Sequence, residues 1–357
     1  MTNSDILEID NLPRLYRHAL VIRWELTRFC NYACDFCIQG SHALHMQAAR
    51  EESPKDRKEI ATRLAAYVEK HVHARQMVEI HLIGGEVTAL PDFPELMEVI
   101  AGCQFRGNID IHLTTNFFRP SDYWKNLFSL FSGKAGRRLF INASFYKRYT
   151  TEGEFAQKIN DLTPFLALPG GNPFSILRYR LLPLFWGRAA VASDAEQVYL
   201  GVGWPILDDA SYHAFLSFKS RYGHLLHSVN PIIIRNYPVP VSEEIRDRLN
   251  GNEGSKNLRV LFRRGGKRYF HNIQQLGNWL ADAGHFCPSG YICDAGKNSF
   301  SISPDGTVSR CPVLNPPADF QLGSFLDGSF RLLRKPAVCS ADHCSCNYFR
   351  KIQCGTR

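Results

Sequence analysis

The sequence predicts an α/β protein in which a parallel sheet is followed by a small cysteine-rich region. Short apolar segments alternate with segments of helical periodicity over residues 20–250, a rhythm typical of βαβ units. Ten of the 11 cysteines lie within residues 30–37 and 287–354. The hydrophobic content of 45% and the charged content of 21% are ordinary for a globular chain of 357 residues.

Six strands are expected, because each is an apolar or alternating segment between turn signals. They span residues 19–26, 78–83, 108–115, 138–145, 175–182 and 230–237. A helix is predicted to begin at Ser53-Pro54, with proline in the first turn. Further helices are expected from Pro91 and over residues 151–166, 210–227 and 241–249. On the third of these, Phe215, Phe218 and Tyr222 recur at helical spacing and are expected in the core.

The pattern changes near residue 258. Residues 259–270 predict a hairpin that turns at Gly265-Gly266, followed by a helix over 273–283 and a hairpin around Pro304-Asp305-Gly306. We therefore expect four regions: an N-terminal extension (1–19), a parallel α/β domain (20–250), a connecting hairpin and helix (251–286) and a cysteine-rich domain (287–357).

Charge and hydropathy exclude several classes of protein. The formal charge of +8 is spread along the chain without a block of like charge, which favours a solvated surface over a nucleic-acid footprint. No apolar run approaches the roughly 18 residues of a membrane helix. The first dozen residues lack the basic start and apolar core of a signal peptide. We expect a cytoplasmic protein, in which clustered cysteines indicate metal binding rather than disulfides.

The first cysteine cluster directly follows the first predicted strand. Cys30, Cys34 and Cys37 have the spacing Cys-x3-Cys-x2-Cys. Three thiolates can hold three corners of a four-iron cluster and leave one iron open, as in a catalytic site. The alternative is a structural zinc knuckle. Cys103 stands alone and is expected to be a small core residue.

This loop, with the aromatic Phe36 before its last cysteine, resembles the motif of the radical S-adenosylmethionine (radical SAM) family. The resemblance implies a partial (β/α)6 TIM barrel and a cluster whose open iron binds the amino and carboxylate groups of SAM. In α/β barrels the chemistry lies at the carboxyl ends of the strands. The cysteine loop is at such an end.

Other positions match the family's SAM-binding motifs. Gly84-Gly85-Glu86, at the end of the second strand, resembles its "GGE" motif: the glycines let the backbone approach a ligand, and the carboxylate would accept from the SAM ammonium. Asn116 and Ser144 match positions after the third and in the fourth strand, although Asn116 can also be a turn cap. Arg178 or Arg180 could reach the SAM carboxylate. The segment Tyr146–Tyr149 is expected to be a solvated loop near the substrate entrance.

The second cysteine cluster resembles the opening of the SPASM and twitch auxiliary-cluster domains, with the pattern Cys293-x12-Gly306-x4-Cys311. The rest departs from that family, because the spacing is Cys339-x4-Cys344-x-Cys346-x7-Cys354, with Cys287 upstream. At least one auxiliary 4Fe-4S cluster is expected. We favour one, held by Cys293, Cys311 and two of Cys339, Cys344 and Cys346, over two, because the seven C-terminal thiols are one short of two four-cysteine sets. Four thiolates would also satisfy zinc. His343 is expected to be solvated.

The resemblance implies an oxidoreductase or maturase that reductively cleaves SAM to a 5′-deoxyadenosyl radical and takes hydrogen from a substrate. The auxiliary cluster would assist electron transfer, and a flavodoxin- or ferredoxin-like protein would supply the electron. The substrate is a peptide, a protein or a small molecule. Only some twenty residues precede the first strand, which argues against leader-dependent peptide maturation unless a separate protein binds the leader. The alternative function is a zinc- or cluster-containing nucleic-acid-binding module without SAM chemistry.

Overall fold

The computed structural model describes residues 19–37, 42–50, 52–74, 76–167, 197–233, 242, 244–245, 258–264, 267–273, 292–293, 295–311, 318–340 and 352–353. Its main sheet has nine strands in the order β12-β11-β10-β1-β2-β3-β4-β5-β6. The first six strands are parallel: β1 (Leu20–Thr27), β2 (Val78–Gly84), β3 (Ile109–Thr115), β4 (Arg137–Ser144), β5 (Val198–Ile206) and β6 (Ser228–Ile233). The predicted parallel α/β architecture is confirmed.

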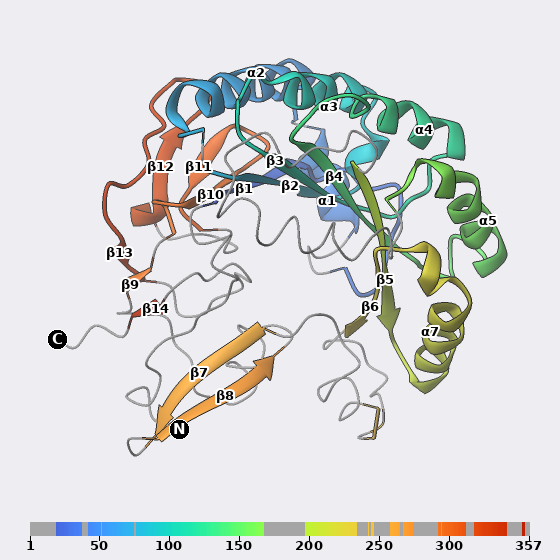
Figure 1. The fold of residues 1–357 in the computed structure, drawn as a ribbon. Helices are drawn as coiled ribbons and strands as arrows, with labels where there is room; N and C mark the ends of the chain where they lie inside the picture. Colours follow the sequence, from blue (N-terminus) through green and yellow to red (C-terminus); the bar gives the residue numbers. More distant parts are fainter. Residues whose placement is uncertain are drawn as a thin grey trace.

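The helices form an arc over the outer face of this curved sheet (Figure 1). They are α2 (Pro54–His71), α3 (Phe93–Gly102), α4 (Ser121–Ser129), α5 (Glu152–Leu162) and α7 (Asp209–Tyr222). A separate short helix, α1 (His42–Ala49), follows the cysteine loop. Within the part of the chain that the structure describes, these five helices lie on one face of the sheet, as in a partial barrel.

Local sequence signals explain where two of these helices begin. The Ser53 hydroxyl accepts a hydrogen bond from the Asp56 amide at 3.2 Å, and Pro54 lies in the first turn, as the sequence predicts. Helix α5 begins with a capping box, in which Thr151 and Glu154 exchange hydrogen bonds between side chain and backbone.

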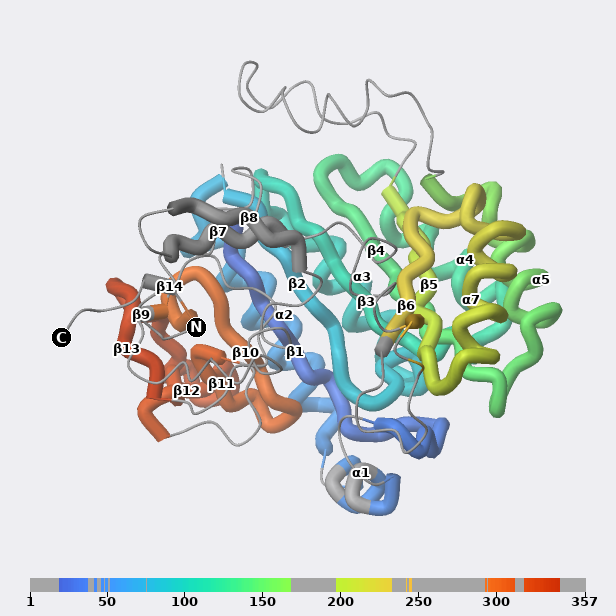
Figure 2. Tube along the Cα trace, turned by 90° about the horizontal axis from the view of Figure 1, so that it is seen from below, coloured from blue at the N-terminus to red at the C-terminus, as the bar shows by residue number. Residues whose placement is uncertain are grey.

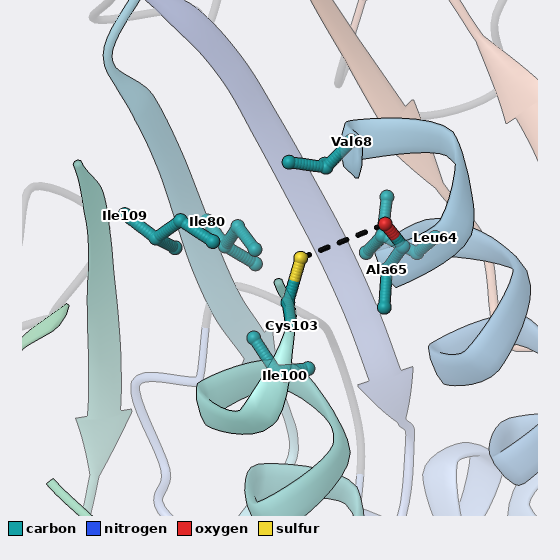
Figure 3. Close-up of a pocket in the computed structure, with 7 residues that line it drawn as sticks. All are labelled: Leu64, Ala65, Val68, Ile80, Ile100, Cys103 and Ile109. Atoms are coloured by element: carbon teal, nitrogen blue, oxygen red, sulfur yellow. Dashed lines mark hydrogen bonds between the residues drawn. The ribbon is translucent and has the colours of Figure 1, made fainter. Parts of the chain in front are cut away.

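The hydrophobic core lies between the sheet and the helices. Phe215 and Phe218 are fully buried and Tyr222 packs against them, as predicted. Cys103 is also a buried core residue, as predicted: its thiol donates to the Ala65 carbonyl at 3.6 Å and lines a small cavity between α2, α3 and the sheet (Figure 3).

The C-terminal region extends the main sheet. Strand β10 (Ser299–Ile302) pairs in parallel with β1, and β11 (Thr307–Ser309) and β12 (Gln321–Ser324) follow as an antiparallel meander. Figure 2 shows these orange strands beside the blue β1. The predicted turn at Pro304-Asp305-Gly306 joins β10 to β11, and Gly306 has a φ of 80°. The cysteine-rich region therefore shares a sheet with the barrel.

Two small sheets complete the described structure. β7 (Leu258–Arg264) and β8 (Lys267–Ile273) pair as an antiparallel hairpin up to Arg264 and Lys267, which confirms the predicted hairpin, while Gly265 and Gly266 lie outside the described residues. The other sheet joins β13 (Ala337–Val338), β9 (Ile292–Cys293) and β14 (Ile352–Gln353). Within the described residues, no helix is long and apolar enough to cross a membrane.

The fifth strand of the sheet differs from the prediction. It is Val198–Ile206, whereas the predicted strand at 175–182, with Arg178 and Arg180, lies outside the described residues. This strand was not predicted because it contains Gly201, Gly203 and Pro205, and glycine and proline are depleted in strands. Helices α1 and α4 were also not predicted. The predicted helix at 273–283 and most of the one at 241–249 lie outside the described residues.

Candidate functional site

The three-cysteine loop leaves the end of β1, at the carboxyl edge of the parallel strands. Cys30 and Cys34 are half-buried and Cys37 is exposed, and the Cys37 amide donates to the Cys34 carbonyl in a turn. Burial raises the pKa of Cys30 to about 11 and that of Cys34 to about 12; Glu86 and then Cys37 add to the shift of Cys30, and Cys30 and Cys37 add to that of Cys34. The loop thus gathers three soft donors whose thiolate forms need a nearby cation, and this donor set fits an iron–sulfur cluster.

The two glycines after β2 let that strand lie against the start of the cysteine loop. A Cβ at Gly84 would lie 2.2 Å from the Thr27 carbonyl oxygen, and one at Gly85 would lie 2.0 Å from the Phe29 oxygen. The Gly85 amide donates to Thr27 at 2.8 Å, and the Glu86 amide donates to Phe29 at 2.7 Å. Glycine is needed here for contact between two backbone segments.

The Glu86 carboxylate is buried and engaged by groups of the chain itself. One oxygen accepts from the Thr88 amide at 3.1 Å, the Thr88 hydroxyl at 2.5 Å and the Thr115 hydroxyl at 2.8 Å. The other accepts from the Asn116 amide at 2.5 Å. Burial raises the pKa of this carboxyl, although the four hydrogen bonds oppose the shift. Glu86 therefore ties the end of β2 to the end of β3.

Asn116 and Ser144 lie at the same edge as the cysteine loop. The Asn116 amide nitrogen donates to the Asn31 side-chain oxygen at 2.8 Å, so the end of β3 holds the loop directly. Ser144 is the last residue of β4 and pairs with Gly203 of β5. Phe36, at the far end of the loop, packs its ring edge-on against Tyr146.

The loop also has a support that the sequence did not indicate. Glu52, just before α2, accepts from the Thr27 hydroxyl at 2.5 Å and from the Arg28 amide at 2.6 Å. Arg57 lies 3.8 Å from Glu52 and also pairs with Asp92. A single glutamate in a polar segment has no sequence signal of its own, so it could be found only in the fold.

Three of the C-terminal cysteines lie close to one another. Cys311 and Cys339 are buried, and Cys293 is half-buried. Burial, and then the thiols of Cys311 and Cys339, raise the pKa of Cys293 to about 11, whereas Arg310 opposes the shift. The pairing of Cys293 with Ala337 brings β9 beside the strand that ends next to Cys339. The remaining cysteines, together with His343, lie outside the described residues: Cys287, Cys344, Cys346 and Cys354.

A row of rings crosses the sheet on the face opposite the core helices. His81, His112, Phe140 and Tyr199 occupy paired positions on β2 to β5, and adjacent rings stack with centroids 4.4 to 4.8 Å apart. Burial lowers the pKa of His81 to about 3 and that of His112 to about 4, so both are neutral near pH 7.

Glu79, His81 and His112 also bring three potential metal-ligand atoms within 4.8 Å of one another. However, the two imidazole planes are inclined by only 8°. A metal ion lies close to the plane of each imidazole that binds it, and two stacked planes share no such point. This arrangement is that of a stacked, uncharged row, and it does not fit a metal site.

Comparison with known proteins gives one family match. Residues 24–136 match the Radical SAM superfamily. The matched segment contains the cysteine loop, Gly84–Glu86 and Asn116, and it ends just as β4 begins.

Curated relatives match nearly the whole chain. The mycofactocin maturase MftC of Mycobacterium ulcerans is 26% identical over 96% of this chain and 86% of its own length. The MftC of Mycobacterium tuberculosis is 25% identical over 97% of this chain and 80% of its own length. Both relatives are similar to this chain and are named as maturases.

Two solved structures were also found by similarity of fold. BtrN in complex with AdoMet and 2-DOIA has a TM-score of 0.37 at 13% identity, over 87% of this chain and 80% of that chain. Streptococcus suis SuiB bound to S-adenosylmethionine has a TM-score of 0.45 at 11% identity, over 88% and 64%.

Proposed function

We propose a reaction for this chain, which is a radical SAM enzyme of the maturase type: hydrogen abstraction from a peptide substrate by a 5′-deoxyadenosyl radical. A 4Fe-4S cluster held by Cys30, Cys34 and Cys37 would supply the one electron that cleaves the carbon–sulfur bond of the SAM sulfonium to methionine and that radical. The radical takes a hydrogen atom from a substrate carbon, which leaves 5′-deoxyadenosine and a substrate radical. A reduced flavodoxin- or ferredoxin-like protein supplies the electron.

One observation carries this proposal: the convergence of three motif segments at one edge of the sheet. Gly84–Glu86 is hydrogen-bonded to the residues that begin the cysteine loop. Asn116 is hydrogen-bonded both to Glu86 and to the loop at Asn31. Segments that are far apart in sequence thus form one continuous site at the carboxyl ends of β1, β2 and β3, where α/β barrels carry their chemistry.

The chain's residues have distinct roles in this proposal. Cys30, Cys34 and Cys37 hold three irons and leave the fourth open to SAM. The backbone of residues 84–86 borders SAM, and the Glu86 carboxylate, occupied by four donors, positions that backbone and Asn116. Ser144, at the end of β4, is assigned to the SAM ribose, and Phe36 to the edge of the cluster.

A peptide is the proposed substrate, rather than a small molecule, because the curated relatives are maturases that match nearly the whole chain. The expectation against leader-dependent maturation is therefore set aside, since a separate protein can present the peptide. The family match also favours the enzyme over the nucleic-acid-binding alternative.

An auxiliary 4Fe-4S cluster is proposed at Cys293, Cys311 and Cys339, with Cys344 or Cys346 as the fourth ligand. The mutual effect of the three described thiols on the pKa of Cys293 supports this grouping. The cluster would exchange an electron with the substrate radical or relay one to the catalytic cluster. Cys311→Ser should remove about four irons and leave the loop cluster and SAM cleavage in place. Bound zinc with unchanged iron would contradict the assignment.

The direct test is anaerobic reconstitution followed by incubation with dithionite and SAM. We expect about eight irons per chain and formation of 5′-deoxyadenosine, since each cubane holds four irons. Cys34→Ala should abolish deoxyadenosine and retain the iron bound by the C-terminal cysteines. Cys103→Ala is the matched control, because this thiol is buried in the core away from both groups. Deoxyadenosine formation by Cys34→Ala would refute the assignment.

A further inference from the structure

The segment Tyr146–Tyr149, which the sequence suggested to be a solvated loop, is a turn packed against the cysteine loop. The Tyr149 amide donates to the Tyr146 carbonyl at 3.0 Å, which closes the turn. Tyr146 is only 8% exposed, and Tyr149 is half-buried. Lys147 and Arg148 are exposed, so the expectation of solvation holds only for the middle of the segment.

Tyr149 makes two different contacts with the cysteine loop. Its ring stacks on that of Tyr32, with centroids 3.9 Å apart and planes inclined by 13°. Its hydroxyl accepts a hydrogen bond from the Ala33 amide at 2.7 Å. Both contacted residues lie between Cys30 and Cys34, so Tyr149 fixes both the position and the rotation of the backbone that carries the thiols.

Neighbouring contacts differ in strength. Phe36 packs edge-on against Tyr146, with centroids 4.9 Å apart. Asp35 and Arg148 form an ion pair at 3.2 Å, but their side chains are 61% and 55% exposed, so this pair contributes little. The tyrosines therefore provide most of the attachment.

The elements on either side hold the Tyr146–Tyr149 turn in place. The preceding Phe145 is buried, its amide donates to the Gly203 carbonyl at 3.0 Å, and its ring stacks on Trp204. The following Thr151 begins the capping box of α5. A residue fixed on both sides by strand and helix can hold a loop, whereas a flexible residue would move with it.

We propose that Tyr149 is a positioning residue for the three-cysteine loop. Its hydroxyl and ring hold the loop in the geometry in which the three thiols bind iron and one iron stays open to SAM. This inference rests on the proposed function for its consequence in catalysis. The contacts of Tyr149 with the loop involve only residues of this chain, so they can be tested separately in the iron-free protein.

The first test measures the loop in the iron-free protein. Alkylation of individual thiols by iodoacetamide is followed by mass spectrometry, with the buried Cys103 as the internal reference. Tyr149→Ala should increase the rate at Cys34 at least several-fold relative to Cys103, and Tyr149→Phe should increase it less because the stack remains. Tyr123→Phe is the matched control, since that hydroxyl on α4 is buried without a hydrogen-bond partner in the described residues. Equal Cys34 rates in Tyr149→Ala and the control would overturn the proposal.

The second test uses the reconstituted enzyme. Tyr149→Phe should retain its iron but lose about 3- to 10-fold in the rate of SAM cleavage, as expected for loss of one hydrogen bond. It should also alter the electron paramagnetic resonance change that SAM produces in the reduced protein, whereas a purely structural role would leave that change as in the parent. If the parent itself cleaves no SAM while Tyr149→Ala still exposes Cys34, the proposed function fails and the role of Tyr149 in positioning the loop stands.

Discussion

The side chain of Asn116, at the end of β3, donates a hydrogen bond to Asn31 inside the cysteine loop at 2.8 Å. The sequence assigned Asn116 either to SAM or to a turn cap. Its oxygen does accept from the Phe118 amide at 3.3 Å, as in a cap, while its nitrogen reaches the loop. One amide group thus stabilises a turn and attaches the loop that carries the three thiols.

Asn116→Ala should reduce SAM cleavage several-fold while iron binding is retained, because one tether of the loop is lost. Asn31→Ala should have a similar effect. The double variant should be no worse than either single one if the two side chains act through their mutual hydrogen bond. Additive losses in the rate of deoxyadenosine formation would instead indicate that Asn116 acts on SAM directly.

Glu86→Gln should destabilise the protein by about 1–3 kcal/mol, because each carboxylate oxygen faces a backbone N–H and glutamine has only one acceptor oxygen. Whichever way the amide is turned, the Thr88 or the Asn116 N–H loses its partner. Denaturant unfolding measures the change. Glu95→Gln is the control, because the ion pair of Glu95 with Lys58 is exposed and should contribute little. Equal stability of the two variants would contradict the buried network.

Gly85→Ala should disrupt the site, because the new Cβ would lie 2.0 Å from the Phe29 carbonyl oxygen and backbone would have to move. We expect loss of iron from the cysteine loop and a lower unfolding midpoint. Gly153→Ala is the matched control: nothing lies within 4 Å of a Cβ at that position, which is in the first turn of α5. It should be neutral or stabilise by up to about 1 kcal/mol. A Gly85→Ala protein with full iron would show that the two segments separate easily.

The ring row predicts a loss of stability in acid. The folded pKa values of His81 and His112, about 3 and about 4, lie below the unfolded value near 6.5. The unfolded chain therefore binds more protons, so stability is full above pH 6.5 and falls as pH decreases towards the folded values. The slope contributed by each histidine is at most about 1.4 kcal/mol per pH unit.

His112→Phe should reduce this slope, because phenylalanine continues the stack and does not titrate. Denaturant unfolding between pH 7.5 and 5 measures it. The groups with electrostatic effects on the two rings remain in the variant: His81 itself, Arg23, Glu79, Asp110 and Arg138. His213→Gln, at an exposed position of α7, is the control. An unchanged slope in His112→Phe would mean that this histidine is already accessible to protons in the folded protein.

The sequence was sufficient wherever a feature depends on local chemistry. The start of α2 at Ser53-Pro54, the strands β2 to β4 and the hairpin at Gly265-Gly266 follow from caps, alternation and turn residues. The resemblance to the radical SAM family was also predicted, because the spacing of three thiols is a specific signal, and residues 24–136 match the Radical SAM superfamily. The roles assigned to the three cysteines remain a prediction.

Features that depend on tertiary contact were not predictable. Strand β5 has glycines at 201 and 203, and those positions contact Ser228 and Ile232 of the neighbouring strand, which only the fold reveals. Gly85 was given a role in approaching a ligand, whereas the contact it permits is with Phe29. Tyr149 was expected to be solvated, because its partners Tyr32 and Ala33 lie far away in the sequence.

The parallel pairing of β10 with β1 has a consequence for biosynthesis. Val21 is made long before its partner Ser299, because the two residues are far apart in the sequence. Until then β1 has an unpaired edge, which invites association with other nascent chains. Closing so long a loop is also entropically slow. The strand that leads to the three-cysteine loop therefore gains its second neighbour only after all the other parallel strands of the sheet have been made.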